Sequence, residues 1–292
     1  MKLDIKKLLI NKLSGNSELW VSNSSYQGHW ITYLSDQHIG KNLRKVGHFQ
    51  EGAISKCLEH IKRLKYVNDG NIFFEIGSNI GTHSIYALRN GFEYAYCFEP
   101  DPNNFKLLKV NQILHGLENR CTNTQIAFSD FTGTTSLETS PTNFGDHRVL
   151  NSDKDIRSKS LHDENNWNKI DISVTSFDKW IKNENLDVSN IGLVWIDTQG
   201  HEGHVLSKAN QLLTNKIPIV VEFWPYGLRR SGGYEKLIES LKNVNMIFDM
   251  RRVDESDSLE PLDLHQLENM YHNFIEKESA NYSPHTDLLL LP

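Results

Sequence analysis

Short apolar runs alternate with segments of helical periodicity along most of this chain. Residues 71–76 form an apolar run with a glycine on each side, and residues 94–98, 193–197 and 218–223 are further runs of this kind. Runs of this length, bounded by turn residues, are typical of strands that are buried on both faces. Between them, apolar residues recur at helical spacing. The alternation predicts an α/β fold with a doubly wound sheet of about seven strands and helices between them.

The remaining helices and strands are predicted from the same two patterns, helical spacing of apolar residues and short apolar runs. Each predicted helix presents one apolar face, and the predicted strands are shorter and bounded by turns. We therefore expect strands at residues 124–128, 172–174, 246–248 and 288–291, and helices at residues 54–64, 101–114, 177–181, 205–213, 234–241 and 264–274.

Residues 1–50 do not share this alternation. We interpret them as an N-terminal cap or extension that precedes one large domain at residues 51–292. Residues 2–13 predict a short helix with apolar side chains on one side and lysines around them, which is typical of a solvated capping helix or of a helix on a membrane surface. Residues 15–50 predict loops and short strands.

The first strand of the domain runs into a glycine turn that is the main functional signal. The strand ends near Glu75, and Gly77, Asn79 and Gly81 follow at alternate positions. Asn tolerates a left-handed backbone better than most residues, so it is admissible in the middle of the turn. The spacing is that of the S-adenosylmethionine loop, acid-x-G-x-G-x-G. It departs from the dinucleotide fingerprint G-x-G-x-x-G, because Ser84 takes the place of the third glycine if Gly81 is skipped.

A second acid, Glu99, follows the next strand. It lies about 20 residues beyond the glycine turn, where a carboxylate can accept hydrogen bonds from both hydroxyls of a ribose. Asp101 and Pro102 form a good N-cap and N1 pair for the following helix, which leaves Glu99 available to a ligand. The alternative is that Glu99 itself caps this helix.

Four of the predicted strands end at or just before an acidic residue. These residues are Glu75, Glu99, Asp197 and Glu222. In an open α/β sheet, ligands bind outside the carboxyl ends of the strands. We therefore expect these acids and the turn at residues 127–130 to share one polar rim, which is the candidate cofactor site.

Residues 139–170 are polar and long for a connection within a compact domain. Such a length is typical of a lid or of a disordered excursion. Within this segment, the sequence Asn-Phe-Gly-Asp-His-Arg at residues 143–148 places a glycine beside an aromatic ring, a carboxylate, an imidazole and a guanidinium. It predicts an acceptor-binding lid, with an ordinary solvated loop as the alternative.

Charge and composition narrow the classes of partner. The formal net charge is −6, so a nucleic-acid partner is not expected. The sequence has no apolar run near the ~20 residues that cross a bilayer, and the N-terminus lacks the pattern of a signal peptide, which predicts a cytoplasmic protein without a membrane span. The three cysteines are far apart in the sequence and predict reduced thiols rather than a disulfide framework or a zinc site.

These motifs, in this order, resemble the FkbM-type family of class I S-adenosylmethionine-dependent methyltransferases. The matching segments are residues 74–81, 98–102, 143–148 and 196–202, within about residues 50–225. The family usually has Glu where this chain has Gln199, and Gln can form hydrogen bonds but cannot act as a base. The resemblance implies a Rossmann-like sheet of seven strands, mostly parallel, whose last strand at residues 288–291 is antiparallel.

The resemblance also implies the activity and the site. The expected cofactor is S-adenosyl-L-methionine, with S-adenosyl-L-homocysteine as the product, and the expected acceptor is a small molecule, a hydroxyl of a sugar or of a glycosylated or secondary metabolite. We assign cofactor binding to Glu75, Gly77, Ser78, Asn79, Gly81, Thr82, Glu99, Pro100, Ala127, Ser129, Asp130 and Asp197. We assign acceptor binding to Asn143, Asp146, Arg148, Gln199, Glu222 and Trp224.

A base assists methyl transfer to a hydroxyl. We expect His201 to act as the base, with His147 as the second choice, because an imidazole titrates near neutral pH. Asp197 would orient the base or face the positive sulfur of the cofactor. For each histidine, a purely structural role is the alternative, and Asp197 could instead cap the following helix.

Three other functions stay open. An N-methyltransferase acting on a small molecule, an NAD-dependent oxidoreductase and a non-catalytic nucleotide-binding module would all use a similar sheet. We predict no metal site, because Asp197 and Glu222 could supply two oxygens but no third ligand has a defined spacing. The sequence predicts neither the identity of the acceptor nor the oligomeric state.

Overall fold

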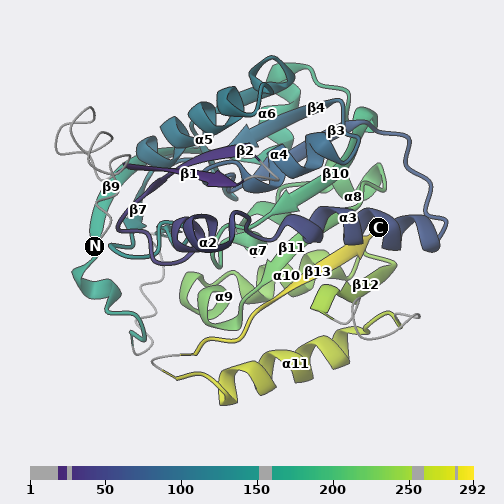
Figure 1. Cartoon of the computed structure of the whole chain (residues 1–292). Helices are drawn as coiled ribbons and strands as arrows, with labels where there is room; N and C mark the ends of the chain where they lie inside the picture. Colours follow the sequence, from purple (N-terminus) through teal and green to yellow (C-terminus); the bar gives the residue numbers. More distant parts are fainter. Residues whose placement is uncertain (1–18, 25–27, 151–159, 252–259, 280–281) are drawn as a thin grey trace.

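A seven-stranded sheet forms the centre of the molecule (Figure 1). The computed structural model describes residues 19–24, 28–150, 160–251, 260–279 and 282–292. In spatial order the strands are β12 (Met246–Asp249), β13 (Thr286–Leu291), β11 (Ile219–Phe223), β10 (Ile191–Ile196), β3 (Ile72–Ile76), β4 (Tyr94–Phe98) and β5 (Cys121–Thr124). The sheet and its helices confirm the predicted α/β fold.

The strand directions define a reversal point in the sheet. β5, β4, β3, β10 and β11 are parallel to their neighbours in this series, and β13 is antiparallel to both β11 and β12. The antiparallel last strand is therefore confirmed. The chain builds outward from β3 to β5 and then returns to the other side of β3 with β10, so the strand order reverses between β3 and β10. Ligands of open α/β sheets bind at the carboxyl ends of the strands beside such a reversal.

Helices cover both faces of the sheet, which explains why its strands are apolar on both sides. In β3, Phe73 packs into one apolar cluster and Phe74 into another, because successive side chains of a strand point to opposite faces. On the Phe73 face lie α3 (Glu51–Arg63), α4 (Thr82–Arg89) and α5 (Pro102–Leu114). On the Phe74 face lie α6 (Phe177–Glu184), α7 (Glu202–Leu206), α8 (Asn210–Thr214), α9 (Pro225–Ser231), α10 (Tyr234–Leu241) and α11 (Leu264–Glu276).

A second, four-stranded sheet lies beside the central one. Its order is β6 (Ala127–Phe128), β9 (Asn168–Thr175), β7 (Gly133–Thr139) and β8 (Arg148–Val149). The predicted strand at residues 124–128 is wrong, because the chain turns after β5, with Ile126 N donating to Thr124 O at 3.0 Å, and β6 then pairs with β9. The described parts of residues 139–170 contribute β8 and the first three residues of β9 to this sheet. These described residues are therefore more ordered than a disordered excursion from the domain would be.

The predicted helix at residues 205–213 is also wrong, because two short helices take its place. α7 ends at Leu206 and α8 begins at Asn210. The carboxylate of Asp178, on α6, accepts hydrogen bonds from Asn210 N and Gln211 N at 3.0 and 3.1 Å. This contact caps α8 from a distant part of the chain, and the periodicity of the sequence does not contain it.

The N-terminal segment holds a hairpin and a helix. β1 (Leu19–Ser24) pairs with β2 (Gly28–Tyr33), in agreement with the short strands expected there. α2 (Ile39–Val46) was not predicted, because only Ile39, Gly40 and Leu43 are buried and they make too short an apolar pattern. Its first turn is held by Asp36, which accepts a hydrogen bond from Gly40 N at 2.7 Å. The predicted helix at residues 2–13 lies outside the described residues.

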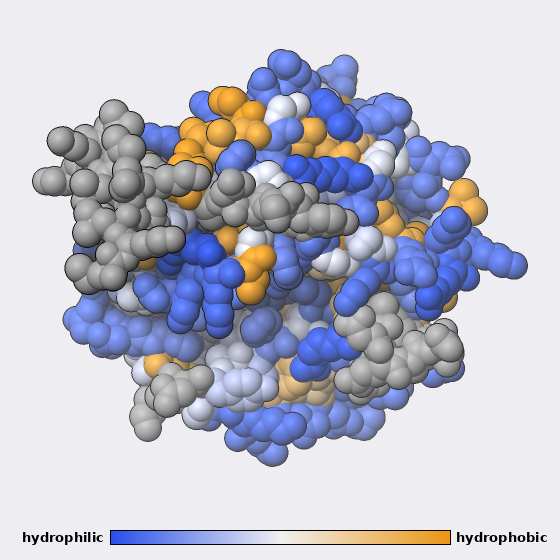
Figure 2. Space-filling view, viewed as in Figure 1, coloured by the Kyte–Doolittle hydropathy of each residue, from blue (hydrophilic) through white to orange (hydrophobic). Residues whose placement is uncertain are grey.

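The surface matches the composition of the chain. The face in Figure 2 is mostly hydrophilic, and its apolar residues form separate groups. Across the described ranges, no helix is both long enough and apolar enough to cross a bilayer.

Candidate functional site

A pocket lies at the carboxyl ends of β3, β4 and β10, where the strand order reverses. Its wall also includes residues of the second sheet and of the segment before β8. The predicted site residues that line it are Gly77, Asn79, Glu99, Pro100, Ala127, His147, Asp197 and Gln199. The other predicted site residues lie outside the lining: Glu75, Ser78, Gly81, Thr82, Ser129, Asp130, Asn143, Asp146, Arg148, His201, Glu222 and Trp224.

The glycine turn is shaped by its contact with β10. Gly77 has a φ of 88°, and a Cβ at this position would lie 1.8 Å from the backbone oxygen of Asp197, so only glycine fits. Asn79 has a φ of 48°, the left-handed conformation that its place in the turn requires. Ser78 closes the turn against β4, because its hydroxyl oxygen accepts a hydrogen bond from Phe98 N at 2.9 Å.

Glu99 lies directly beside this turn. One carboxylate oxygen accepts from Asn79 N and the other from Asp101 N, each at 2.8 Å. Burial raises the pKa of Glu99 to about 8. Asp101 caps α5 by accepting from Asn103 N and Asn104 N, both at 2.8 Å, so Glu99 does not cap this helix. Each Glu99 oxygen accepts one backbone N–H and keeps a lone pair for a ligand.

Glu75 points toward α4 instead of lining the pocket. It is 1% exposed, and its carboxylate accepts from Ser84 N at 3.2 Å. The ring nitrogen Nδ1 of His83 lies 3.6 Å from the same carboxylate. Glu75 therefore stabilises the start of α4 behind the glycine turn.

His201 belongs to a buried network outside the pocket. Its Nε2 lies 2.9 Å from the hydroxyl oxygen of Ser129, and its ring stacks on His204 at 4.3 Å. Asp130 links this network to the surface, because its carboxylate lies 3.0 Å from Lys236 Nζ. Burial lowers the pKa of His201 well below its ordinary value. Ser129 and Asp130, both predicted at the cofactor site, are used in this network.

His147 does line the pocket. Its Nδ1 lies 3.8 Å from the nearer carboxylate oxygen of Asp101 and has no hydrogen-bond partner among the described residues. Burial lowers the pKa of His147, so its neutral form is favoured near neutral pH. Of the two predicted bases, it is the one that the structure brings to the pocket.

The segment that carries His147 is fastened to the glycine turn and to the N-terminal segment. The backbone oxygen of Phe144 accepts from Asn79 Nδ2 at 2.7 Å and from Asn104 Nδ2 at 2.9 Å. The Phe144 ring packs against Tyr33 with 4.9 Å between centroids. Gln37 N donates to Thr142 O at 2.8 Å. The wall of the pocket is thus built from three distant parts of the chain.

Arg148 lies behind this wall in a buried cluster. It is 2% exposed and donates to both carboxylate oxygens of Asp146 at 2.6 and 2.7 Å and to Glu164 at 2.5 Å. The rings of Trp167 and Trp224 each lie 4.7 Å from its guanidinium carbon. Arg148, Asp146 and Trp224, predicted to bind the acceptor, therefore join β8 to neighbouring elements.

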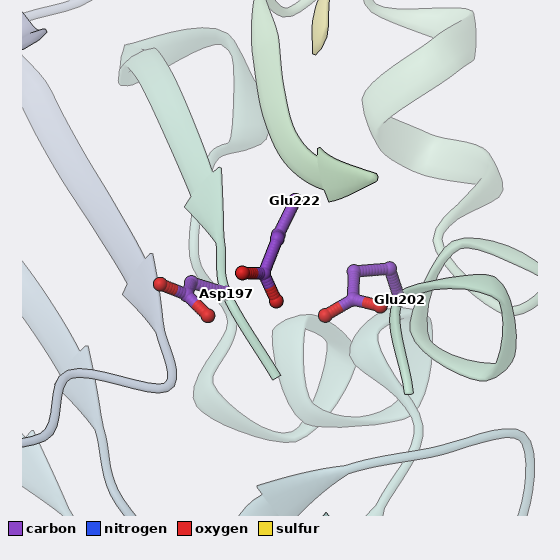
Figure 3. A group of neighbouring side chains, drawn as sticks. All are labelled: Asp197, Glu202 and Glu222. Carbon is purple, nitrogen blue, oxygen red and sulfur yellow. The ribbon is translucent and has the colours of Figure 1, made fainter. Parts of the chain in front are cut away.

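Three carboxylates converge beyond the end of β10, from Asp197, Glu202 and Glu222 (Figure 3). One oxygen of each lies within 4.8 Å of the others. The Gln199 amide donates to Asp197 at 2.6 Å and to Glu222 at 3.0 Å and thus bridges two of them. Glu202 accepts from Thr198 N at 2.8 Å. Burial raises the pKa of Glu202 to about 7 and the pKa of Glu222 well above its ordinary value.

Glu202 supplies the third carboxylate of this group, which the sequence analysis did not find. It was visible in the sequence as an acid in the turn after β10, but only the fold brings it to Glu222. Asn104 and Phe144 are further pocket residues that the sequence analysis did not assign. Asn104 has a sequence signal, because it is the third residue of the helix that Asp101 caps.

The chain matches a known protein family and a curated relative. The methyltransferase FkbM domain matches residues 75–252. The 2-O-methyltransferase NoeI from Sinorhizobium fredii (strain NBRC 101917 / NGR234) is 29% identical over an alignment of 159 residues, and the match covers 52% of this chain and 63% of NoeI. The match thus spans less than two thirds of the length of that relative.

Solved methyltransferase structures resemble the chain at low identity. A putative O-methyltransferase from Klebsiella pneumoniae has a TM-score of 0.43 and 10% sequence identity. The match covers 98% of this chain and 96% of the Klebsiella chain. An O-methyltransferase from Bacillus cereus, in complex with SAH, has a TM-score of 0.41 and 9% sequence identity. The match covers 89% of this chain and 99% of the Bacillus chain. The strand order, rather than these scores, establishes the fold. Since the domain match spans more than half of the sequence, this chain belongs to the methyltransferase FkbM domain family.

Proposed function

We propose that this protein is an S-adenosylmethionine-dependent O-methyltransferase that acts on a hydroxyl of a sugar or a glycosylated or secondary metabolite. The observation that carries the proposal is the position of Glu99, buried beside the glycine turn at the reversal point of an FkbM-family chain. The relative NoeI is a 2-O-methyltransferase, which supports oxygen as the methylated atom.

The residues around the glycine turn fit a ribose-bearing cofactor. Gly77 presents backbone without a side chain, and each oxygen of Glu99 keeps a lone pair beyond its bond to a backbone N–H. The side-chain oxygen of Asn79 is buried without a hydrogen-bond donor in the described structure. These acceptors would hold the ribose hydroxyls, and Ala127 and Pro100 would line the space beside the adenine. S-adenosylmethionine, when bound, supplies a methyl group activated by a positive sulfur.

The acceptor would bind on the opposite side of the pocket, toward Asp197 and Gln199. Their carboxylate and amide can orient the hydroxyls of a sugar, and Glu222 holds the amide from behind. Methyl transfer is an in-line displacement, so most of the rate comes from holding the acceptor oxygen at about 3 to 3.5 Å from the methyl carbon. His147 would take the proton from the acceptor hydroxyl.

The first test is calorimetric titration with S-adenosylmethionine and S-adenosylhomocysteine, with NAD as the control. The proposal expects micromolar binding of both sulfur compounds and none of NAD. Binding of NAD alone would replace the proposal with an oxidoreductase. If the sulfur compounds bind, sugars and glycosylated metabolites are screened as acceptors by the release of S-adenosylhomocysteine, with amines in parallel to detect N-methylation.

A further inference from the structure

Two asparagine side chains in the pocket hold the same backbone oxygen. Asn79 Nδ2 and Asn104 Nδ2 donate to Phe144 O at 2.7 and 2.9 Å. A carbonyl oxygen can only accept hydrogen bonds, so both carboxamides must turn their NH₂ groups toward it. This contact fixes which end of each amide is nitrogen, an assignment that is otherwise ambiguous for Asn. The side-chain oxygens of both residues therefore face away from Phe144 O.

These two oxygens have no donor. Asn79 Oδ1 and Asn104 Oδ1 are both buried, and neither accepts a hydrogen bond within the part of the chain that the structure describes. Asn104 is 1% exposed. A buried acceptor left without a donor costs roughly 1–3 kcal/mol, so such atoms are normally satisfied by water or a ligand. Both residues line the same pocket as Glu99.

The kind of group that would satisfy them follows from the chemistry of the surrounding atoms. The two amide oxygens are hydrogen-bond acceptors, and so is the Glu99 carboxylate in its ionised form. A group with several donors, such as two neighbouring hydroxyls, would pair with them. A phosphate would not, because it brings mainly acceptors to two amide oxygens that need donors.

We infer that Asn104 is a further cofactor-binding residue, and that its side-chain oxygen and that of Asn79 accept hydrogen bonds from the ribose hydroxyls beside Glu99. The inference deepens the proposed function and rests on it. Asn104 is well placed for this role, because Asp101 accepts a hydrogen bond from its backbone N–H at 2.8 Å and fixes the first turn of α5. The Asn104 side chain then makes two contacts at once: its NH₂ group donates to Phe144 O in the pocket wall, and its oxygen accepts from the ligand.

The test separates these two roles by a double-mutant cycle between protein and ligand. The wild type and Asn104→Ala are titrated calorimetrically with S-adenosylhomocysteine and with its 2′-deoxy and 3′-deoxy analogues. We expect Asn104→Ala to weaken binding of S-adenosylhomocysteine by at least ~5-fold, and to weaken one deoxy analogue by less than ~2-fold, because the bond is already missing there. Asn103→Ala, an exposed neighbour on the same helix, should bind all three ligands like the wild type.

Two results would overturn the inference. One is unchanged binding of S-adenosylhomocysteine by Asn104→Ala. The other is an equal loss for all three ligands, which would mean that Asn104 only anchors the Phe144 wall. Absence of binding to the wild type would instead refute the proposed function, so the two failures are distinguishable.

A second variant keeps the test decisive if Asn104→Ala does not fold. Asn104→Asp retains an acceptor oxygen and the shape of the side chain but loses the NH₂ donor to Phe144 O. We expect it to preserve the preference of the wild type for S-adenosylhomocysteine over the deoxy analogues. Loss of that preference in a folded Asn104→Asp protein would overturn the inference.

Discussion

Glu99 combines burial with unused hydrogen-bonding capacity, and this combination leads to a prediction about binding. At about pH 9, where the Glu99 carboxyl is ionised, Glu99→Ala removes both charge-assisted hydrogen bonds that the carboxylate would accept from a ribose. We expect the variant to lose at least ~2 kcal/mol of binding free energy for S-adenosylhomocysteine, which is roughly a 30-fold rise in Kd. Calorimetry measures it. Glu93→Ala, an exposed acid just before the same strand, is the control, and equal affinities of Glu99→Ala and wild type would contradict the assignment.

The raised pKa of Glu99 predicts how stability depends on pH. The folded protein keeps the Glu99 proton up to about pH 8, whereas the unfolded chain releases it near 4.5. Between these values folding takes up a proton, so the contribution of Glu99 is fully present below the lower value and is lost as the pH rises through the upper one. Glu202, whose pKa is raised to about 7, acts in the same direction.

We therefore expect the free energy of unfolding to fall from about pH 7.5 to about pH 9, and to fall less in Glu99→Gln, which has no titrating group at this position. Above about pH 7.5 the histidines with lowered pKa values are largely neutral in both the folded and the unfolded state and add little slope. Urea titrations of both proteins across this window measure the effect. Identical slopes for the two proteins would show that Glu99 is already ionised in the folded state.

Site residues defined by backbone geometry were predictable from the sequence, and those defined by packing were not. Gly77 and Asn79 are required by a turn, and Glu99 by its place after a strand, so each is visible as a local pattern. His201 and Asn104 depend on which way a helix faces. The sequence placed His201 near the acceptor, but α7 turns it into a buried network, while α5 turns Asn104 toward the pocket.

At the scale of elements, the Arg148 cluster joins β8 to the 3₁₀ turn at residues 164–166 and to α9. Its carboxylate partners Asp146 and Glu164 are both buried, and Tyr226 of α9 also donates to Glu164. Arg148→Ala would leave two buried carboxylates without their cation. We expect a loss of about 3–5 kcal/mol of unfolding free energy, measured by urea denaturation.

An exposed ion pair provides the matched control for this prediction. Arg63 pairs with Glu59 at 2.6 Å, but their side chains are 52% and 61% exposed. Arg63→Ala should therefore change the unfolding free energy by at most about 0.5 kcal/mol. A similar small effect for Arg148→Ala would mean that the cluster does not hold β8 in place.

The predicted boundaries of helices and strands agree with the structure where the apolar pattern is long. They are wrong where contacts with distant parts of the chain determine where an element ends. β3, β4, β11 and β13 coincide closely with their predicted runs, because a strand buried on both faces must be apolar throughout. The break between α7 and α8 depends on Asp178, which precedes it by about 30 residues in the chain. The end of β5 depends on β9, which offers a new partner to β6. Neither contact is visible in a local window.

At the scale of the whole molecule, the N-terminal segment shares the core of the sheet domain. Trp30 is 0% exposed and belongs to the same apolar cluster as Phe73 of β3. The side chain of Asn111, on α5, bonds the backbone of Ile31 in both directions, at 2.8 and 3.2 Å. We therefore propose that residues 28–50 fold and unfold cooperatively with the predicted domain, which was expected to begin at residue 51.

Trp30→Ala tests this unit, because the substitution removes a large buried side chain from the N-terminal segment alone. If the unit is cooperative, the cavity should lower the unfolding free energy of the whole chain by about 3–5 kcal/mol, in a single transition. Urea denaturation followed by far-UV circular dichroism and by Trp fluorescence measures it, with Val67→Ala, 82% exposed, as the control. A separate cap would give a different result, since its early unfolding would leave the main transition unchanged. In that case residues 28–50 would be an appendage, and the contacts of Tyr33 and Gln37 with the pocket wall could open without unfolding the sheet.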